Sequence, residues 1–443
     1  MCGRLTVAFA MTRHDDRSTA VSLRRNTAWA LAGNVGYAAC QWGVLVAIAK
    51  LAAVDAVGRF ALGLAIAGPV FILSNLNLRA VQATDARRQY DFSEYLGLRL
   101  TTIAAALAVI TAIALAAGYR GHTLVLLLGV ALAKAFEAAS DAVFGLLQQA
   151  ERLRRVALSL LVKGIASVLA VTSVLRLTGN VALAVLAMAG CWASVLALVD
   201  LPAAARLASL RPTFACHRLA ELAWLALPLG CVMGVNSLTT NVPRYAIAAH
   251  LGATALGHFT AVVYVLVAAS QPVFALGAAV SPRLACHFIG DRRAYVQLSR
   301  NAMLLAAALG ALAVTAAAVA GPRFLRVAYA PEYAADAEVL CWIAVVGCVG
   351  FVSSILGFAV TAARRFPQQL AVACLALGVC ALASQWLVPR FGLIGAAWAL
   401  LASEGVRLLC LGIVYKLACV SDRRTVSEVE MPRVRLDEAS IIA

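Results

Sequence analysis

Three charged side chains, Lys134, Glu137 and Asp141, stand inside an otherwise apolar stretch, TLVLLLGVALAKAFEAASDAVFGLL (123–147). At about 100° per residue they fall within about 60° of one another, so they share one face of a helix. A charge at the centre of a membrane-spanning helix costs roughly 2.5–3.5 kcal/mol. This face therefore either lines a polar cavity or pairs with polar groups of other helices. In a cavity, the amine could bind an anion, and the titratable groups Glu137 and Asp141 could bind a proton or a metal cation.

The composition indicates the kind of protein that carries these charges. Of 443 residues, 63% are hydrophobic and 13% are charged, and the mean hydropathy is +0.88, whereas soluble domains carry about 25% charged residues. We therefore predict an all-α polytopic membrane protein. The net charge of +16 is explained by cytoplasmic loops rich in Lys and Arg, so it predicts no nucleic-acid partner.

A helix needs about 20 mostly apolar residues to cross a bilayer. On that basis we expect twelve spans, near 27–50, 57–78, 99–119, 122–147, 156–177, 180–201, 221–249, 256–281, 301–320, 337–362, 369–388 and 392–416. We expect a tail at 1–25, six-helix halves at 26–218 and 219–418, and a second tail at 419–443.

The loops on one side hold 16 Lys and Arg residues, including Arg79, Arg99 and Arg283, against 7 on the other. Because basic loops stay in the cytoplasm, both termini are predicted to be cytoplasmic.

The two halves resemble each other in short matching segments. GPVFIL (68–73) matches QPVFAL (271–276), and Gly58 and Phe60 match Gly257 and Phe259. Six spans are an even number, so both halves enter the membrane in the same direction. Parallel repeats of this kind are typical of transporters, with the substrate between the halves.

Further polar side chains lie within the predicted spans. Ser237, Asn241 and Arg244 share one face near Pro243. Arg244 either contacts a phosphate, for which its planar fork is suited, or only extends to the headgroups. On the first span Asn34, Tyr37 and Gln41 share a face that either contacts sugar hydroxyls or packs against another helix.

Lys163 lies at a depth similar to that of Asp141, and we expect the two to form an ion pair unless Lys163 extends to the headgroups. Arg79 and Arg283 end repeat-related spans. They either guide an anion inward or only follow the charge rule for cytoplasmic loops. Glu404 and Arg407, three residues apart, are expected to pair with each other.

Motifs for catalysis and for metals are missing from the sequence. We find no phosphate loop, HExxH, GxSxG or dinucleotide fingerprint, and no long external loop for a polymerase or ligase. The 12 cysteines form no CxxC and no His-Cys cluster at metal spacing. We predict no enzyme activity, no metal and no cofactor.

Three segments resemble polysaccharide flippases of the multidrug/oligosaccharidyl-lipid/polysaccharide exporter superfamily. The segment 252–285 carries the Gly-x-Phe, Tyr and Pro-Arg-Leu pattern as Gly257, Phe259, Tyr264, Pro282, Arg283 and Leu284. VAYAPEYAADAEVLCWIA (327–344) is similar to the family's Gly-Pro-Glu-Tyr segment, with Ala330 in place of Gly. FGLIGAAWALLASEGVRLL (391–409) resembles its last span, and the likeness extends over residues 26–418.

This resemblance implies a V-shaped pair of six-helix lobes around a cationic cavity in the bacterial inner membrane. It implies a polyprenyl-pyrophosphate-linked oligosaccharide as cargo, moved from the cytoplasmic to the periplasmic leaflet for O-antigen, capsule or exopolysaccharide synthesis. Polymerase and chain-length proteins are the expected partners, beside membrane lipids.

We expect Lys134, Lys163 and Arg244 to hold the cargo headgroup during alternating access. Coupling to protons or sodium, if present, would use Glu137 and Asp141. The alternatives are a multidrug cation antiporter, a membrane polymerase or ligase, and a scaffold without transport activity.

Overall fold

The computed structural model describes residues 28–29, 31–85 and 89–425. The tail expected at 1–25 and residues 426–443 of the second tail lie outside this part of the chain. All regular secondary structure in the described ranges is helical. Apolar helices satisfy their own backbone hydrogen bonds, which the interior of a bilayer requires.

The first bundle is made of the helices in residues 31–205. In chain order they are Leu31–Leu51, α2 (Val54–Ser74), α3 (Leu78–Thr84), α4 (Phe92–Ala116), α5 (Gly121–Gln149), α6 (Leu153–Thr178) and α7 (Val181–Val195). A π-helical turn, Leu196–Asp200, continues α7 into the short α8 (Leu201–Ala205).

The second bundle is made of the helices in residues 216–425. They are α9 (Cys216–His250), α10 (Gly252–Gly290), α11 (Arg292–Ala328), α12 (Ala337–Ala362) and α13 (Phe366–Thr425), with a 3₁₀ turn at Pro331–Asp336.

The number of membrane-crossing helices agrees with the sequence. Ten helices in the described part are long and apolar enough to cross a membrane, and the two segments of α9 together give an eleventh. One of the ten, Pro367–Cys419, contains two helices that join at Gly392, where the backbone is not helical. Its 53 residues would extend about 80 Å as one rod, far more than the ~30 Å bilayer core. The twelve expected spans are thus accounted for.

Arg99 corrects one boundary of the sequence prediction. It was assigned to a loop, but α4 begins at Phe92 and Arg99 is a fully buried helix residue. The helix begins early because the Glu94 carboxylate accepts the backbone N–H of Asp91 at 2.8 Å, which satisfies a donor at the helix start.

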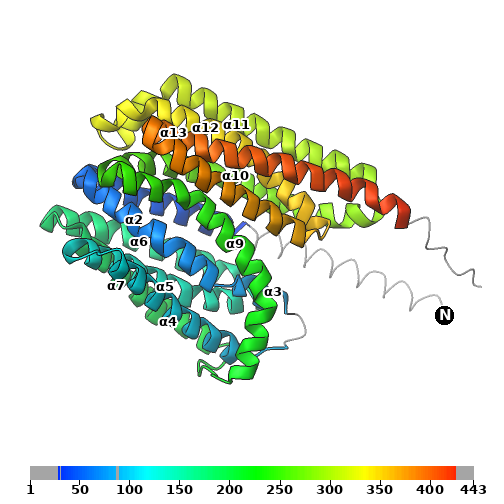
Figure 1. Ribbon diagram of the computed structural model, residues 1–443. Coiled ribbons are helices and arrows are strands. Elements are labelled where there is room, and N and C mark those ends of the chain that lie inside the picture. Colours follow the sequence, from blue (N-terminus) through cyan, green and yellow to red (C-terminus); the bar gives the residue numbers. More distant parts are fainter. Residues whose placement is uncertain (1–27, 30, 86–88, 426–443) are drawn as a thin grey trace, which may run out of the picture.

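The bundles cross each other closely at one end of the molecule. In Figure 1 the blue-to-teal helices form one group and the yellow-to-red helices another. Gly58 of α2 and Gly257 of α10 meet where these helices cross, and a Cβ on Gly257 would lie 3.1 Å from the Gly58 nitrogen. We call this side the crossing end, and the opposite side, where Arg79 follows α2, the arginine end. The crossing joins repeat-related glycines.

Hydrogen bonds also join the bundles at the crossing end. Trp42 Nε1 donates to the Tyr329 hydroxyl at 2.8 Å, and Lys50 Nζ donates to the Val327 carbonyl at 2.8 Å. The Tyr329 hydroxyl in turn donates to the Ala261 carbonyl of α10 at 2.8 Å.

Helix α9 lies between the bundles and contacts the first bundle on both sides of a bend. Its segments Cys216–Pro228 and Gly230–His250 meet at 52°, as expected where proline removes a backbone donor. Before the bend, Arg218 Nε donates to Glu94 Oε1 of α4 at 2.8 Å. After it, Gly230 packs on Leu76, in the left-handed turn after α2 (φ 50°). Further along, the Tyr245 hydroxyl donates to the Ala65 carbonyl of α2.

Candidate functional site

A cavity of about 590 Å³ lies between the bundles and is lined by both. From the first bundle it receives residues of Leu31–Leu51, α2, α5 and α7; from the second it receives residues of α9, α10, α12 and α13. Its polar lining comprises Tyr37, Gln41, Trp42, Lys134, Glu137, Trp192, Thr240, Arg244, Tyr264, Ser270, Gln271, Ser354, Glu404 and Arg407. Five of the residues that the sequence predicts to bind cargo or a coupling ion thus line it: Tyr37, Gln41, Lys134, Glu137 and Arg244.

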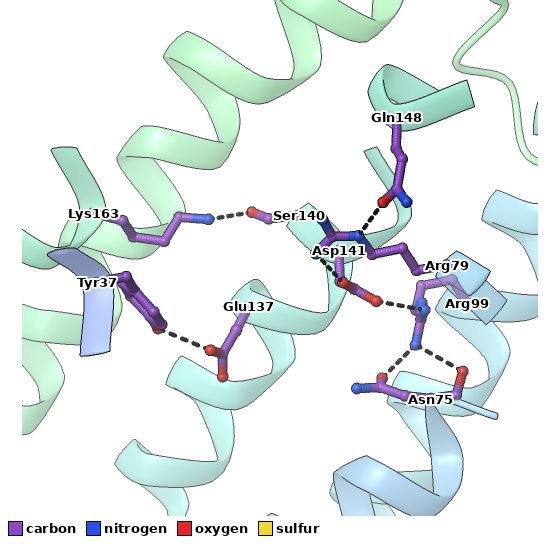
Figure 2. A network of polar contacts seen from close by, with 9 residues as sticks. All are labelled: Tyr37, Asn75, Arg79, Arg99, Glu137, Ser140, Asp141, Gln148 and Lys163. Carbon is purple, nitrogen blue, oxygen red and sulfur yellow. Dashed lines mark hydrogen bonds and ion pairs between the residues drawn. The ribbon is translucent and has the colours of Figure 1, made fainter. Parts of the chain in front are cut away.

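Lys134 and Glu137 line the cavity and also pair with each other. Lys134 Nζ lies 2.6 Å from Glu137 Oε2. The Tyr37 hydroxyl donates to Glu137 Oε1 at 2.8 Å, as Figure 2 shows. The two alternatives drawn from the sequence, cavity lining and pairing, are both realised. Because the charges offset each other, this pair adds no net charge to the site.

Arg244 brings an unbalanced positive charge. Its side chain lies on α9 beside the ring of Tyr264, with the guanidinium carbon 6.0 Å from the ring centroid. One terminal nitrogen donates to Asn241 Oδ1 at 2.9 Å, but the Nε–H is buried without a hydrogen-bond partner. The residue is 9% exposed. A buried donor without an acceptor is costly, so the site favours a ligand that supplies one.

Ser237 and Asn241 support Arg244 from the same helix. Asn241 Nδ2 donates to the backbone carbonyl of Ser237 at 2.8 Å, which turns its Oδ1 toward Arg244. Neither is among the residues that line the cavity. They orient the guanidinium.

Gln41 presents a second buried donor, because its Nε2 has no hydrogen-bond partner and the residue lines the cavity. Asn34, two turns earlier on the same helix, is exposed and does not line the cavity. The face that the sequence predicts from these three residues therefore lines the cavity at Tyr37 and Gln41 but not at Asn34.

Lys163 lies outside the cavity, and the prediction that it forms an ion pair with Asp141 is wrong. Lys163 Nζ contacts Asp200 Oδ2 at 3.3 Å and donates to Ser140 Oγ at 2.6 Å. Lys163 and Asp200 are each 1% exposed. The Phe144 ring contacts both cations of this region: its centroid lies 5.1 Å from Lys163 Nζ and 5.7 Å from the Arg79 guanidinium carbon.

Asp141 belongs to a separate network at the arginine end (Figure 2). Its carboxylate lies 3.1 Å from Arg99 and 3.5 Å from Arg79. Arg79 Nε also donates to Gln148 at 3.1 Å, and Arg99 donates to Asn75 where α2 ends. Through their bonds to Asp141, the two arginines link α3 and α4 to α5, and the bond to Asn75 adds the end of α2. Arg283 lies on α10, exposed and apart from the cavity.

The second bundle contributes a charged pair whose place in the cavity the sequence did not indicate. Arg407 donates to Glu404 Oε1 at 3.2 Å, which confirms the expected pairing, and Ser353 Oγ donates to Oε2 at 2.7 Å. Both charged residues line the cavity. The sequence signal for this position was an acidic and a basic residue in the middle of an apolar span.

The described lining holds three cations, Lys134, Arg244 and Arg407, against two carboxylates, Glu137 and Glu404. The cavity is therefore electropositive by one charge, and that charge belongs to Arg244. Among the described residues, no group of three or more His, Cys, Asp or Glu side chains could hold a metal ion.

Comparisons with known proteins identify the family of the chain. The family model described as "Polysaccharide biosynthesis protein" matches residues 23–287. The chain is 23% identical over 396 residues to the capsular polysaccharide biosynthesis protein CapF of Staphylococcus aureus, covering 88% of this chain and 99% of that protein.

Solved structures with a similar fold are transporters. Lipid II flippase MurJ, in an inward closed conformation, superimposes with a TM-score of 0.67 at 12% identity, over 90% of this chain and 87% of that one. An inward-facing multidrug resistance MATE family transporter of the MOP superfamily gives 0.64 at 14% identity, over 90% and 96%. The all-helical fold is thus shared with these transporters. This multi-pass membrane protein belongs to the polysaccharide biosynthesis protein family.

Proposed function

We propose that the chain is a flippase for a polyprenyl-pyrophosphate-linked oligosaccharide, which it moves from the cytoplasmic to the periplasmic leaflet of the bacterial inner membrane. The observation that carries the proposal is Arg244, a buried guanidinium in an electropositive cavity with an unsatisfied Nε–H. A pyrophosphate offers the acceptor oxygens that this donor lacks, and arginine can bind it with two parallel hydrogen bonds.

The cargo would serve the synthesis of a surface polysaccharide such as O-antigen, capsule or exopolysaccharide. Polymerase and chain-length proteins would act on it after transfer. Both termini would be cytoplasmic, which places the arginine end on that side. The bundles are joined at the crossing end, so the headgroup would enter from the arginine end and leave after the bundles rock apart.

Lys134 and Glu137 have separate parts in this proposal. Lys134 would add attraction for the pyrophosphate once its pairing with Glu137 loosens. Glu137 is the better candidate for coupling to a proton or sodium gradient, because Asp141 is held by two arginines outside the cavity. Lys163, Arg79, Asn34 and Arg283 would contribute less to binding, since none of them lines the cavity.

The test is transport of lipid-linked oligosaccharide in proteoliposomes, together with surface polysaccharide in a strain lacking the gene. Arg244→Ala should reduce transport at least about tenfold, as expected for losing a charge-assisted contact, and Arg244→Lys should restore only part. Arg59→Ala is the matched control, because Arg59 pairs with Asp55 on the helix surface. Glu137→Gln should keep cargo binding but remove any dependence on the gradient.

The proposal would be contradicted if cells that produce the Arg244→Ala protein at the wild-type level made a normal amount of surface polysaccharide. The alternative function is a multidrug cation antiporter, in which the two cavity carboxylates and the aromatic rings would bind an organic cation. Drug resistance conferred on an efflux-deficient strain, without transport of lipid-linked oligosaccharide, would favour it.

A further inference from the structure

The cavity contains chemistry that a pyrophosphate does not need. An ionised pyrophosphate offers only acceptors, so it would be repelled by Glu137 and Glu404, both of which line the cavity. Carboxylates are acceptors only, and they suit a ligand that presents O–H or N–H donors. A sugar beside the pyrophosphate has such donors.

Glu404 is held in place as such an acceptor by groups of two helices. Arg407 on α13 donates to Oε1, and Ser353 on α12 donates to Oε2 from a fully buried position. Each carboxylate oxygen has two lone pairs, so each oxygen has one further acceptor position beside the bond to Arg407 or Ser353. The Glu404 side chain is 17% exposed, enough to be reached from the cavity.

The neighbourhood of Glu404 leaves room for a ligand. Gly350, also in the lining, faces this carboxylate, and a Cβ there would lie 3.7 Å from Glu404 Oε2. Gln271, Ser354 and the ring of Phe274 border the same cavity. Polar groups beside an aromatic ring are what a carbohydrate, with hydroxyls and apolar faces, requires.

We infer that Glu404, oriented by Ser353 and Arg407, recognises the sugar nearest the pyrophosphate, whereas Arg244 binds the pyrophosphate itself. This inference rests on the proposed function and assigns the two parts of the cargo to two different residues of the second bundle. Glu404 accepts sugar hydroxyl or amide hydrogens, and Ser353 and Arg407 are positioning residues. Glu137, paired with Lys134 on the first bundle, is left for ion coupling.

Two probes separate the parts of the cargo. One is undecaprenyl pyrophosphate without sugar, and the other is the lipid-linked oligosaccharide fraction extracted from the cells that produce this chain. Dissociation constants are measured on the full chain in nanodiscs by the quenching of tryptophan fluorescence, since Trp42 and Trp192 line the cavity. Native mass spectrometry provides an independent measurement.

Glu404→Gln should weaken binding of the oligosaccharide probe about tenfold and leave that of undecaprenyl pyrophosphate within twofold. Arg244→Gln should weaken both probes. Asp55→Asn, which breaks a surface pair, should change neither.

A second variant reaches the same carboxylate without altering a charge. Gly350→Ala places a methyl group against Glu404 at ordinary van der Waals distance, so folding is preserved while access narrows. It should weaken only the oligosaccharide probe. Gly357→Ala on the same helix, with nothing within 4 Å of the new Cβ, is the matched control.

Each failure has its own meaning. If the wild-type chain binds neither probe, the proposed function fails. If it binds both with equal affinity, or if Glu404→Gln weakens both alike or neither, the flippase proposal stands and the assignment of Glu404 to the sugar is overturned.

Discussion

At the scale of single residues, the structure separates charges that line the cavity from charges that are buried within one bundle. Lys134 and Lys163 look equivalent in the sequence, one amine in each of two apolar spans. Lys134 lines the cavity, whereas Lys163 is sealed with Asp200 inside the first bundle. Burial around each amine decides its role.

We expect Lys163→Met to destabilise the protein by roughly 3–5 kcal/mol, because it leaves the Asp200 carboxylate buried without its cation. The double change Lys163→Met with Asp200→Leu should recover much of this loss, since an apolar pair can replace a buried ion pair. Thermal unfolding in detergent measures both effects.

The transport activity of the double variant distinguishes the two roles considered for Lys163. A folded, active double variant assigns the pair to stability. A folded but inactive one would support the substrate contact expected from the sequence and would contradict the structural role.

The sequence located some of these side chains and missed others for a physical reason. Helical spacing was enough to place Lys134 and Glu137 on one face of their helix and Tyr37 on a polar face of another, because that depends on local geometry. That the two faces meet was not predicted. It could not identify Asp200 as the partner of Lys163, because the pairing depends on how α6 packs against the π-helical turn. The only acidic residue in the segment 181–205 was the available clue.

At the scale of helices, the crossing of α2 and α10 depends on the absence of side chains. A Cβ on Gly58 would overlap the carbonyl oxygen of Ala253, and a Cβ on Gly257 would lie 2.5 Å from that of Val54. Backbone atoms cannot move aside as a flexible side chain can, so the helices approach this closely only with glycine on both.

Gly58→Ala should therefore separate the two helices and lower thermal stability by about 1–3 kcal/mol, as overpacking does. Gly68→Ala is the control on the same helix, because its new Cβ would have nothing within 4 Å. Equal melting temperatures for the two variants would show that the contact contributes nothing to stability.

Helix boundaries show the same limit of sequence reasoning. The apolar stretches predicted the spans well because every spanning helix must be apolar where it meets lipid. Charges near helix ends were read as loop residues, and Arg99 shows why this fails: Asp141 and Asn75 accept its hydrogen bonds inside the bundle. Such a partner is visible only once α2, α4 and α5 are packed together.

At the scale of the whole molecule, the crossing end is held by bonds between the bundles in which Tyr329 takes a central part. Its hydroxyl accepts from Trp42 of the first bundle and donates to Ala261 of the second. Tyr329→Phe removes both bonds and leaves the ring. The bundles should then separate more readily at this end.

Hydrogen–deuterium exchange should reveal this as faster exchange at the end of Leu31–Leu51 and around the end of α11, with no change at the arginine end. Tyr295→Phe is the matched control, because Tyr295 also donates to a backbone carbonyl, that of Ala359, but entirely within the second bundle. If the two variants exchange at the same rate at the crossing end, Tyr329 does not contribute to holding the bundles together there.

The bend in α9 lies in a helix that carries Arg244 and contacts the first bundle. Before the bend, Arg218 pairs with Glu94 of α4, and after it the Tyr245 hydroxyl donates to the Ala65 carbonyl of α2. Arg244, the residue before Tyr245, is the cavity's unbalanced cation. Because α9 contacts the first bundle on both sides of its bend, a change in the angle between the bundles would change the bend as well. A ligand bound to Arg244 would then act directly on the helix that bends, so loading and release would need no relay of intermediate side chains.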